Sequence, residues 1–418
     1  MSSTKLFKNV RLKGQKELTS ILVEDGVFKR ISADLPEQAG CEVIDLQGKL
    51  VIPPYVDPHM HLDYVFTAGL GEENGSGTLF EGIQRWSESK GHMTVEQMKE
   101  RIYSGIRKEM LNGVQAIRTH IDVTDPTFTG LKAALEVRDE VKDILDLQIV
   151  AFPQEGMYAY KGGDELVEEA LKMGADCVGA IPHFELAREF GEKSVHKAIE
   201  LAVKYDKLLD AHCDETDDTQ SRFLELLNAL ALMEGIGTRT TASHTCSFGS
   251  ADNSYAFRMM KLFKKSGINF ISCPTENVYL EGRQDTYPKR RGITRVKELY
   301  DNGINVCFAQ DSMSDPWYPL GNGNMMMILD HGIHLAQMMP PEITNDLDLV
   351  TTNGAITMSI TDRYGIEEGK PANFIVLDAK SEFEAICERA GITASVRHGE
   401  YLFEKIPAKV TGAIDLLK

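Results

Sequence analysis

Residues 50–61 read LVIPPYVDPHMH, and this stretch sets the frame for interpreting the rest of the chain. An apolar run leads through two prolines and Asp57 into a pair of histidines, His59 and His61. Alternate side chains of a β-strand point to the same face, so both imidazoles can contact one ion, with Asp57 as an outer-shell group. An isolated His-x-His pair is a weak signal, and its meaning depends on what the other strands of the fold contribute.

Further short apolar runs follow, and each ends in polar or ionisable residues. Stretches with helical periodicity, such as 163–174, 194–206 and 220–235, lie between them. Alternating strands and helices predict parallel strands joined by right-handed crossovers, and eight such units predict an α/β fold of the (β/α)₈ barrel type. A doubly wound open sheet is the competing fold, but no glycine-rich phosphate loop follows the first strand. The further runs are VQAIRTHIDV (114–123), DLQIVAFPQEG (146–156), ADCVGAIPHFE (175–185), KLLDAHCDE (207–215), TRTTASHTCS (238–247), INFISCPTEN (268–277) and INVCFAQDS (304–312).

Both ends of the chain consist of short stretches with strand-like alternation, separated by glycines. This pattern predicts one discontinuous small domain built from both termini, and two independent β appendages are the alternative. The strand-like stretches are residues 5–12, 20–26, 27–33 and 41–53 at one end, and 372–379, 394–404 and 408–416 at the other.

Composition indicates a soluble globular enzyme with a small-molecule substrate. Of the 418 residues, 42% are hydrophobic and 26% are charged, with a net charge of −18. An acidic surface repels phosphate backbones and anionic lipids, so we expect neither a nucleic-acid polymer nor a membrane as partner. The N-terminal stretch MSSTKLFKNVRLKGQ lacks the apolar run of a signal peptide, and the seven cysteines form no paired framework. We therefore expect a cytoplasmic location.

The strand ends contain a candidate metal site, because strand ends converge on the C-terminal face of a barrel. His212 ends the fifth run and Asp311 the eighth. Together with the His-x-His pair, they offer neutral imidazoles and a carboxylate, which suit a divalent ion such as Zn²⁺ or Fe²⁺. Cys213 follows His212 directly and is expected to face away from the barrel axis as a core residue.

Several motifs resemble those of a known family. PHMH, HCDE, SHT and the aspartate closing the eighth strand resemble the amidohydrolase superfamily. More narrowly, GTLFEGIQRW, VAFPQEG, GAIPHFE, HCDETDD, TASHT, DTYPKRRGITRVKE and DPWYPLG resemble bacterial cytosine deaminases over essentially the whole barrel. The resemblance implies a distorted (β/α)₈ barrel over residues 55–364. It also implies a small β-sandwich from residues 1–54 and 365–418, and a homo-oligomer.

The resemblance also implies a ligand set and a mechanism. The fourth run ends in IPHFE and contains no lysine of the kind that bridges two metals, which favours a single-metal deaminase over a two-metal cyclic-amide hydrolase. Glu215 is then the acid/base that protonates the ring nitrogen, and His244 holds and polarises the attacking water. Asp311 binds metal and relays a proton to the departing amine. The implied ligands of one divalent ion are His59, His61, His212 and Asp311.

Other residues are candidates to contact a flat heterocyclic substrate. Gln154 carries both a carbonyl and an amide, which match the donor–acceptor edge of a lactam. Phe152 and Trp317 are candidates to cover the ring, because aromatic faces stack on conjugated heterocycles. Leu79 matches a family position at which a backbone carbonyl faces the substrate. For Phe152 and Leu79, simple core packing is an equally good interpretation.

Ser312 departs from the family pattern. In cytosine deaminases the metal-binding aspartate is followed by a second aspartate near the pyrimidine ring, and serine is smaller and uncharged. A methyl group typically shifts selectivity by about 1–3 kcal/mol. We therefore hypothesise that the chain converts 5-methylcytosine and water to thymine and ammonia, with cytosine to uracil as a related activity. The alternatives are an ordinary cytosine or isoguanine deaminase and, in a different class, a non-catalytic scaffold.

Overall fold

The computed structural model of the protein describes residues 4–37, 39–339, 342–406 and 412. The chain divides into two compact units. One unit comprises Met1–Pro54 and Arg363–Lys418, and the other comprises Tyr55–Asp362. The resemblance implies a barrel over residues 55–364, and the corresponding compact unit ends at Asp362.

Within the described residues, eight parallel strands of the second unit form one sheet whose spatial order follows the chain, β6 to β13. This arrangement confirms the predicted barrel. The ring closes where Met60 forms a parallel bridge with Asp311, whose backbone N–H donates to the His59 carbonyl at 2.8 Å. The strands are β6 (Tyr55–Met60), β7 (Val114–Asp122), β8 (Asp146–Phe152), β9 (Cys177–Ala180), β10 (Leu208–Cys213), β11 (Thr240–His244), β12 (Asn269–Ser272) and β13 (Val306–Phe308).

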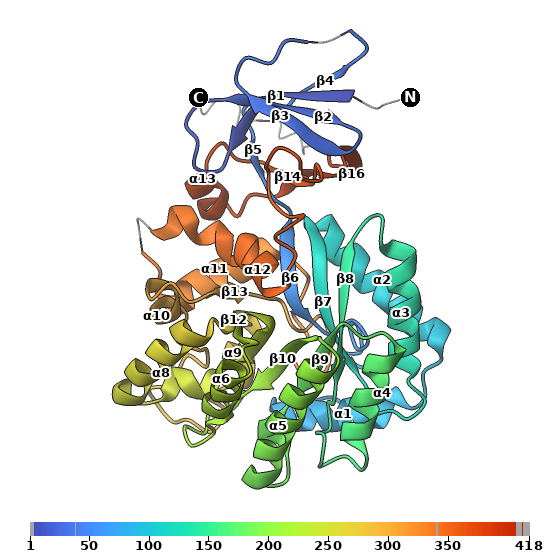
Figure 1. Cartoon of the computed structure of the whole chain (residues 1–418), viewed down its shortest axis with the longest axis vertical. Helices are drawn as coiled ribbons and strands as arrows, with labels where there is room; N and C mark the ends of the chain where they lie inside the picture. Colours follow the sequence, from blue (N-terminus) through green and yellow to red (C-terminus); the bar gives the residue numbers. More distant parts are fainter. Residues whose placement is uncertain (1–3, 38, 340–341, 407–411, 413–418) are drawn as a thin grey trace. The chain divides into compact units, whose positions relative to one another are not determined.

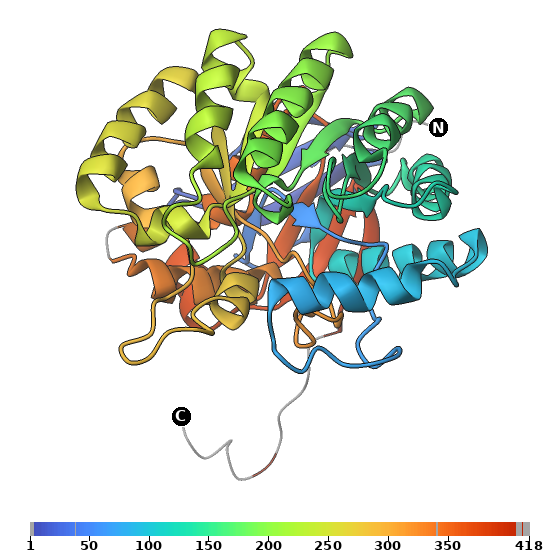
Figure 2. The same ribbon diagram turned by 90° about the horizontal axis from the view of Figure 1, so that it is seen from below.

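Helices lie around the barrel strands, as Figures 1 and 2 show. The helix predicted over 163–174 is α4 (Gly163–Met173), and that over 220–235 is α6 (Phe223–Met233). The helix predicted over 194–206 is α5 (Arg188–Lys204). The predicted start is too late because residues 188–190 are exposed, so the first turn shows no apolar stripe in the sequence. The other helices and 3₁₀ turns of this unit are α1 (Leu79–Lys90), α2 (Val95–Leu111), α3 (Thr129–Val141), η1 (Pro182–Phe184), η2 (Gly237–Arg239), α7 (Cys246–Ser250), α8 (Asn253–Ser266), α9 (Pro274–Leu280), α10 (Val296–Asp301), α11 (Met325–Ala336), η3 (Glu342–Val350) and α12 (Thr352–Thr357).

The barrel interior contains a buried ion pair. Arg118 on β7 has no exposed surface, and its Nη1 donates to Asp210 Oδ2 on β10 at 2.9 Å. Its Nη2 donates to the Thr357 carbonyl at 2.8 Å. A charged group that is removed from water requires such partners. The ion pair therefore links β7 to β10, and Arg118 also links β7 to α12.

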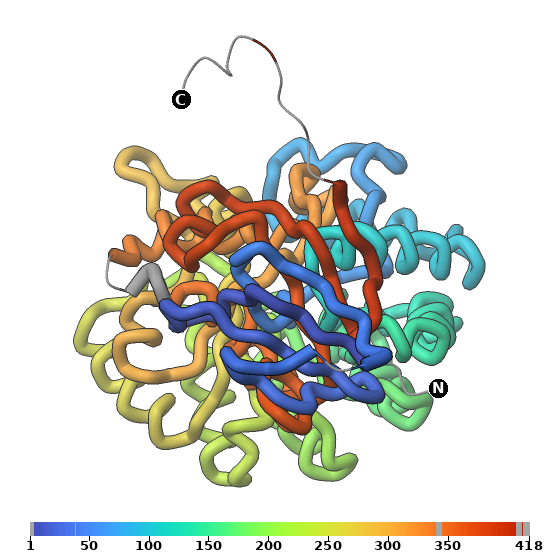
Figure 3. The backbone as a smooth tube through the Cα atoms, turned by 90° about the horizontal axis from the view of Figure 1, so that it is seen from above, coloured from blue at the N-terminus to red at the C-terminus, as the bar shows by residue number. Residues whose placement is uncertain are grey.

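The terminal unit is a sandwich-like sheet to which both chain ends contribute (Figure 3). Strand β1 belongs to both halves, since residues 4–10 pair with β2 while Arg11 and Leu12 pair with β5. Strands β5 and β14 pair antiparallel, which joins the two termini. Apolar side chains from the two halves, including Phe7, Phe28 and Phe374, form a buried cluster. The elements are β1 (Thr4–Leu12), β2 (Thr19–Glu24), β3 (Val27–Ser32), β4 (Glu42–Asp45), β5 (Leu50–Ile52), β14 (Phe374–Leu377), α13 (Glu382–Cys387), β15 (Ile392–Arg397) and β16 (Glu400–Glu404).

Two further expectations from the sequence concern the C-terminal strand-like stretch and the membrane. The strand-like stretch 408–416 lies outside the described residues except for Gly412. Among the helices that the structure describes, none has both the length and the apolar character needed to cross a membrane.

Candidate functional site

Four side chains from the ends of three barrel strands converge at one point. His59 lies on β6, and His61 directly follows that strand. His212 lies on β10, and Asp311 follows β13. The Nε2 atoms of His59 and His61 lie 3.2 and 3.1 Å from His212 Nε2. The same two nitrogens lie 3.6 and 3.4 Å from Asp311 Oδ1. The structure therefore brings together one atom from each of the four expected ligands: the Nε2 atoms of the three histidines and Oδ1 of Asp311.

These spacings fit a single metal ion. Ligand atoms about 2.0–2.1 Å from an ion in a tetrahedral arrangement lie about 3.3 Å from one another. Burial lowers the pKa of His59, His61 and His212 well below the usual range, so each imidazole is neutral and has one ring nitrogen with a lone pair to offer. Three neutral imidazoles and one carboxylate are a donor set suited to a divalent ion.

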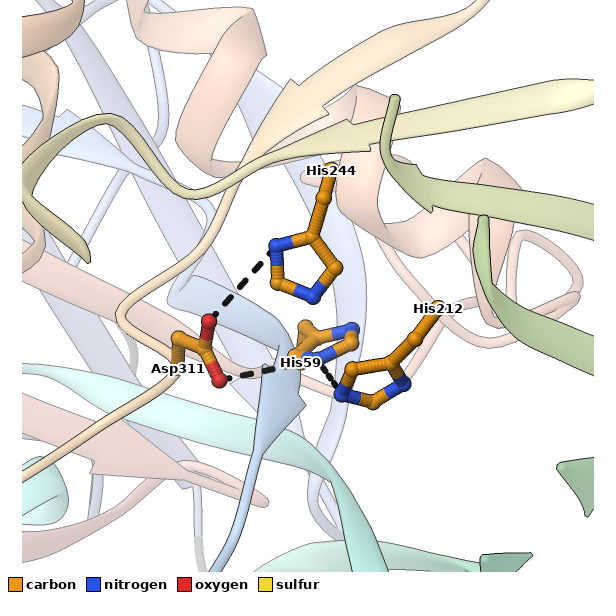
Figure 4. Close-up of side chains that lie close together, drawn as sticks. All are labelled: His59, His212, His244 and Asp311. Carbon is orange, nitrogen blue, oxygen red and sulfur yellow. Dashed lines mark hydrogen bonds and ion pairs between the residues drawn. The ribbon is translucent and has the colours of Figure 1, made fainter. Parts of the chain in front are cut away.

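His244 lies close enough to join this group. Together with His59, His212 and Asp311 it offers ligand atoms that all lie within 4.8 Å of one another, and Figure 4 shows these side chains pointing toward one another. Its backbone φ of 66° and the φ of 69° at Asp311 are left-handed conformations. Such conformations are costly for residues other than glycine, so the surrounding structure holds both residues in place.

The orientation of His59 follows from a hydrogen-bond chain into the barrel interior. Ser243 Oγ lies 2.6 Å from Asp210 Oδ1 and 3.0 Å from His59 Nδ1. The Asp210 carboxylate accepts from Arg118 through Oδ2 and from the serine hydroxyl through Oδ1. The serine oxygen then accepts from His59 Nδ1–H, which leaves the lone pair of His59 Nε2 directed at the ligand cluster.

Glu215 and His244 lie beside the cluster, as expected. Glu215 Oε1 lies 3.3 Å from His244 Nδ1, and His244 Nδ1 lies 3.7 Å from Asp311 Oδ2. Burial lowers the pKa of His244 to about 3, whereas burial and then the Asp311 carboxylate raise the pKa of Glu215 well above its usual value. The pair therefore combines a neutral imidazole with a carboxyl whose pKa is shifted upward, an arrangement suited to acid–base catalysis.

The residues expected to contact the substrate differ in whether their side chains already have hydrogen-bonding or stacking partners within the protein. Gln154 follows β8 and is 2% exposed, and its Oε1 has no hydrogen-bond partner among the described residues. Phe152 ends β8 and stacks on His212, with ring centroids 4.1 Å apart. One face of the Phe152 ring is thus in contact with a candidate metal ligand, and Gln154 has an acceptor available for a ligand.

Trp317 and Leu79 are joined to each other. The Trp317 indole N–H donates to the Leu79 carbonyl at 3.1 Å, so this carbonyl already has one partner. A side chain at Gly82 would lie within 2.4 Å of the indole, so glycine is needed there for Trp317 to lie against α1. On the other side, Tyr64 lies between Trp317 and His61, with centroid distances of 4.4 and 4.6 Å.

Ser312 is buried near two carboxyl groups. Burial raises the pKa of Glu276 and of Asp315, and the nearby Ser312 hydroxyl opposes this rise in both. Asp315 also accepts the backbone N–H groups of Met313, Trp317 and Tyr318, each at 3.0 Å, and so holds the loop that carries Trp317. Although position 312 itself has no charge, the Glu276 carboxyl group from α9 is close enough to the Ser312 hydroxyl for its pKa to be affected.

Asp57 and Cys213 were expected to lie behind the ligands and in the core, respectively, and both are buried. Asp57 is fully buried, and its Oδ1 accepts the backbone N–H groups of His59 and Gln310 at 3.3 and 3.2 Å, which aligns β6 with the end of β13. Cys213 is fully buried, with its thiol 3.9 Å from Asp214 Oδ2.

Sequence reasoning missed Asn277, Glu276 and Tyr64. The seventh predicted run, 268–277, has Thr275 and Glu276 as its polar end, but these residues and Asn277 lie in the first turn of α9, which turns Asn277 toward Glu215. Tyr64 follows the His-x-His pair by three residues, where an aromatic residue gives no specific signal.

Comparisons with known proteins agree with this geometry. Residues 42–400 match the family described as the Amidohydrolase family. A curated relative, N-isopropylammelide isopropyl amidohydrolase from Pseudomonas sp. (strain ADP), is 29% identical over 86% of this chain and 87% of its own length. The crystal structure of 5-methylcytosine deaminase from Klebsiella pneumoniae liganded with 5-fluorocytosine is 49% identical, with a TM-score of 0.95. That similarity covers 97% of this chain and 99% of the Klebsiella chain.

Proposed function

Because the chain belongs to the Amidohydrolase family, we propose that it is a metal-dependent deaminase of free cytosine-type bases. It converts 5-methylcytosine and water to thymine and ammonia, with cytosine to uracil as a related activity. The observation that carries this proposal is the 49% identity to the Klebsiella 5-methylcytosine deaminase over nearly the whole chain. A cytoplasmic location and assembly as a homo-oligomer belong to the same proposal.

The family and the His/Asp cluster indicate a single divalent ion, which we propose is Zn²⁺ or Fe²⁺. When bound, such an ion lowers the pKa of a water molecule toward neutrality. The proposed ligands are His59, His61, His212 and Asp311.

We propose that Glu215 moves the proton that the ring nitrogen needs. Its Oε1 accepts from Asn277 Nδ2 at 3.2 Å, whereas its buried Oε2 has no hydrogen-bond partner among the described residues. We propose that Oε2 donates its proton to the ring nitrogen next to C4 while the oxygen of a water molecule adds at C4, and that Asp311 accepts the proton that this water releases. His244 orients the incoming water. Asp311 then passes this proton to the amino group, which leaves as ammonia as the C4–N bond breaks. The C4 hydroxyl returns its proton to Glu215 as the C4=O bond forms.

Removal of the metal is expected to abolish activity and lower stability. A ligand present at 1,000 times its dissociation constant stabilises the folded state by about 4 kcal/mol. Dialysis against a chelator should therefore lower the melting temperature and stop ammonia release, and one equivalent of Zn²⁺ or Fe²⁺ per chain should restore both. Full activity in protein shown to be metal-free would contradict the proposed metal dependence.

Replacing Ser312 by aspartate is expected to shift selectivity from 5-methylcytosine toward cytosine. The larger, charged side chain occupies space beside C5 and adds a carboxylate next to Glu276 and Asp315. The ratio of kcat/KM for 5-methylcytosine to that for cytosine should fall by about 10–200-fold, as for other single-methyl discriminations. Ser312→Ala adds no volume and serves as the control that keeps the 5-methylcytosine preference. A clear cytosine preference of the unaltered enzyme would refute the assignment.

A further inference from the structure

Asn277 contacts both of the groups assigned to proton transfer. It lies on α9, directly after β12, and has no exposed surface. Its side-chain Nδ2 lies 3.2 Å from Glu215 Oε1 and 3.2 Å from His244 Nδ1. A single amide nitrogen thus connects the carboxyl group to the imidazole.

The chemistry of the amide determines which atoms carry the protons. Nδ2 has two hydrogens and no lone pair to accept with, so Glu215 Oε1 and His244 Nδ1 must both act as acceptors. The His244 proton then resides on Nε2, and any proton on Glu215 resides on Oε2. These are the two atoms of the pair that are buried without a hydrogen-bond partner among the described residues.

The amide also excludes a competing arrangement. His244 Nδ1 lies 3.3 Å from Glu215 Oε1, close enough for these two groups to bond directly through an N–H on Nδ1. In that arrangement Nδ1–H would face the Nδ2 hydrogens of Asn277, and His244 Nε2 would lose its proton. Two donors facing each other in a buried site are unfavourable, so the amide selects the Nε2–H tautomer.

We infer that Asn277 is a positioning residue for deamination, which holds His244 as the Nε2–H tautomer and directs the reactive oxygen of Glu215, Oε2, at the substrate. This inference rests on the proposed function, because it assigns Asn277 a role through Glu215 and His244. Asn277 itself does not donate or accept the transferred protons.

The test replaces the amide donor while keeping the shape of the side chain. Asn277→Asp places an oxygen where Nδ2 was, and Asn277→Leu removes the donor without adding a charge. Both variants are expected to lower kcat for 5-methylcytosine by about 100-fold, the lower range for loss of acid–base catalysis, with KM changed far less. Bound metal per chain and the melting temperature, measured in parallel, should stay close to those of the unaltered enzyme in at least the Leu variant.

Asn269 offers a matched control. It lies on β12, is 2% exposed, and donates through Nδ2 to the backbone carbonyls of Thr238 and Thr240, away from Glu215 and His244. Asn269→Asp makes the same chemical change in an equally buried amide, so it should affect stability and leave the kcat of the folded enzyme unchanged.

The outcomes separate this inference from the proposed function. An active enzyme in which both Asn277 variants keep their kcat, or lose it in proportion to bound metal or folded protein, would overturn the positioning role alone. An unaltered, metal-loaded enzyme that releases ammonia from no cytosine-type base would overturn the proposed function, and the positioning role with it.

Discussion

Replacing Glu215 by glutamine is expected to lower kcat for 5-methylcytosine by about 10²–10⁴-fold, the range for loss of a general acid–base group. Glutamine keeps the size of the side chain and can still accept from Asn277, but it has no acidic proton to give to the ring nitrogen. KM and the metal content should remain close to those of the unaltered enzyme, because Glu215 is not among the proposed ligands. Steady-state kinetics with metal analysis measure all three quantities.

The acidic run that contains Glu215 supplies its own control. Asp218 lies three residues further along, is exposed, and accepts the backbone N–H of Gln220 at 2.8 Å. Asp218→Asn also removes one negative charge from the run, and kcat should be unaffected. If Glu215→Gln retained a kcat similar to that of Asp218→Asn, Glu215 would be a structural carboxyl and the proton path through Oε2 would be wrong.

Replacing Arg118 by methionine is expected to cause the largest loss of stability. The change leaves Asp210 buried without its ion-pair partner, and breaking a buried pair from one side costs about 3–5 kcal/mol. The Thr357 carbonyl on α12 also loses a donor. Chemical denaturation of Arg118→Met and the unaltered protein, both without metal, measures the difference in the free energy of unfolding.

Two comparisons isolate the cause of this loss. Arg138→Met breaks a partly exposed ion pair, in which Nη1 lies 2.9 Å from Asp176 Oδ2, and should cost no more than about 1 kcal/mol. The double variant Arg118→Met/Asp210→Leu removes both buried charges and should be more stable than Arg118→Met alone. If Arg118→Met were as stable as Arg138→Met, the buried Asp210 carboxylate would not depend on Arg118 for its stability.

The predictable parts of the fold were those with a local signal. The eight strands were predicted because each is a short apolar run that ends in polar residues, and the helices because an apolar stripe repeats along them. The predicted start of α5 is too late because residues 188–190 are exposed and show no apolar stripe. The turn of Thr275–Asn277 into α9 was missed because three polar residues after a strand suit a strand end and a helix start equally well.

The sequence by itself determined that His59 and His61 share one face of a strand, because side-chain alternation along a strand is a local property. It also determined that polar groups gather at one end of a parallel barrel. Only the tertiary structure decided which atoms meet. Asp311 reaches the two histidines because the barrel closes through its bridge with Met60, and no local pattern encodes a contact across about 250 residues of chain. The same packing brings Asn277 between Glu215 and His244, where the choice of hydrogen-bond donor sets the position of each proton.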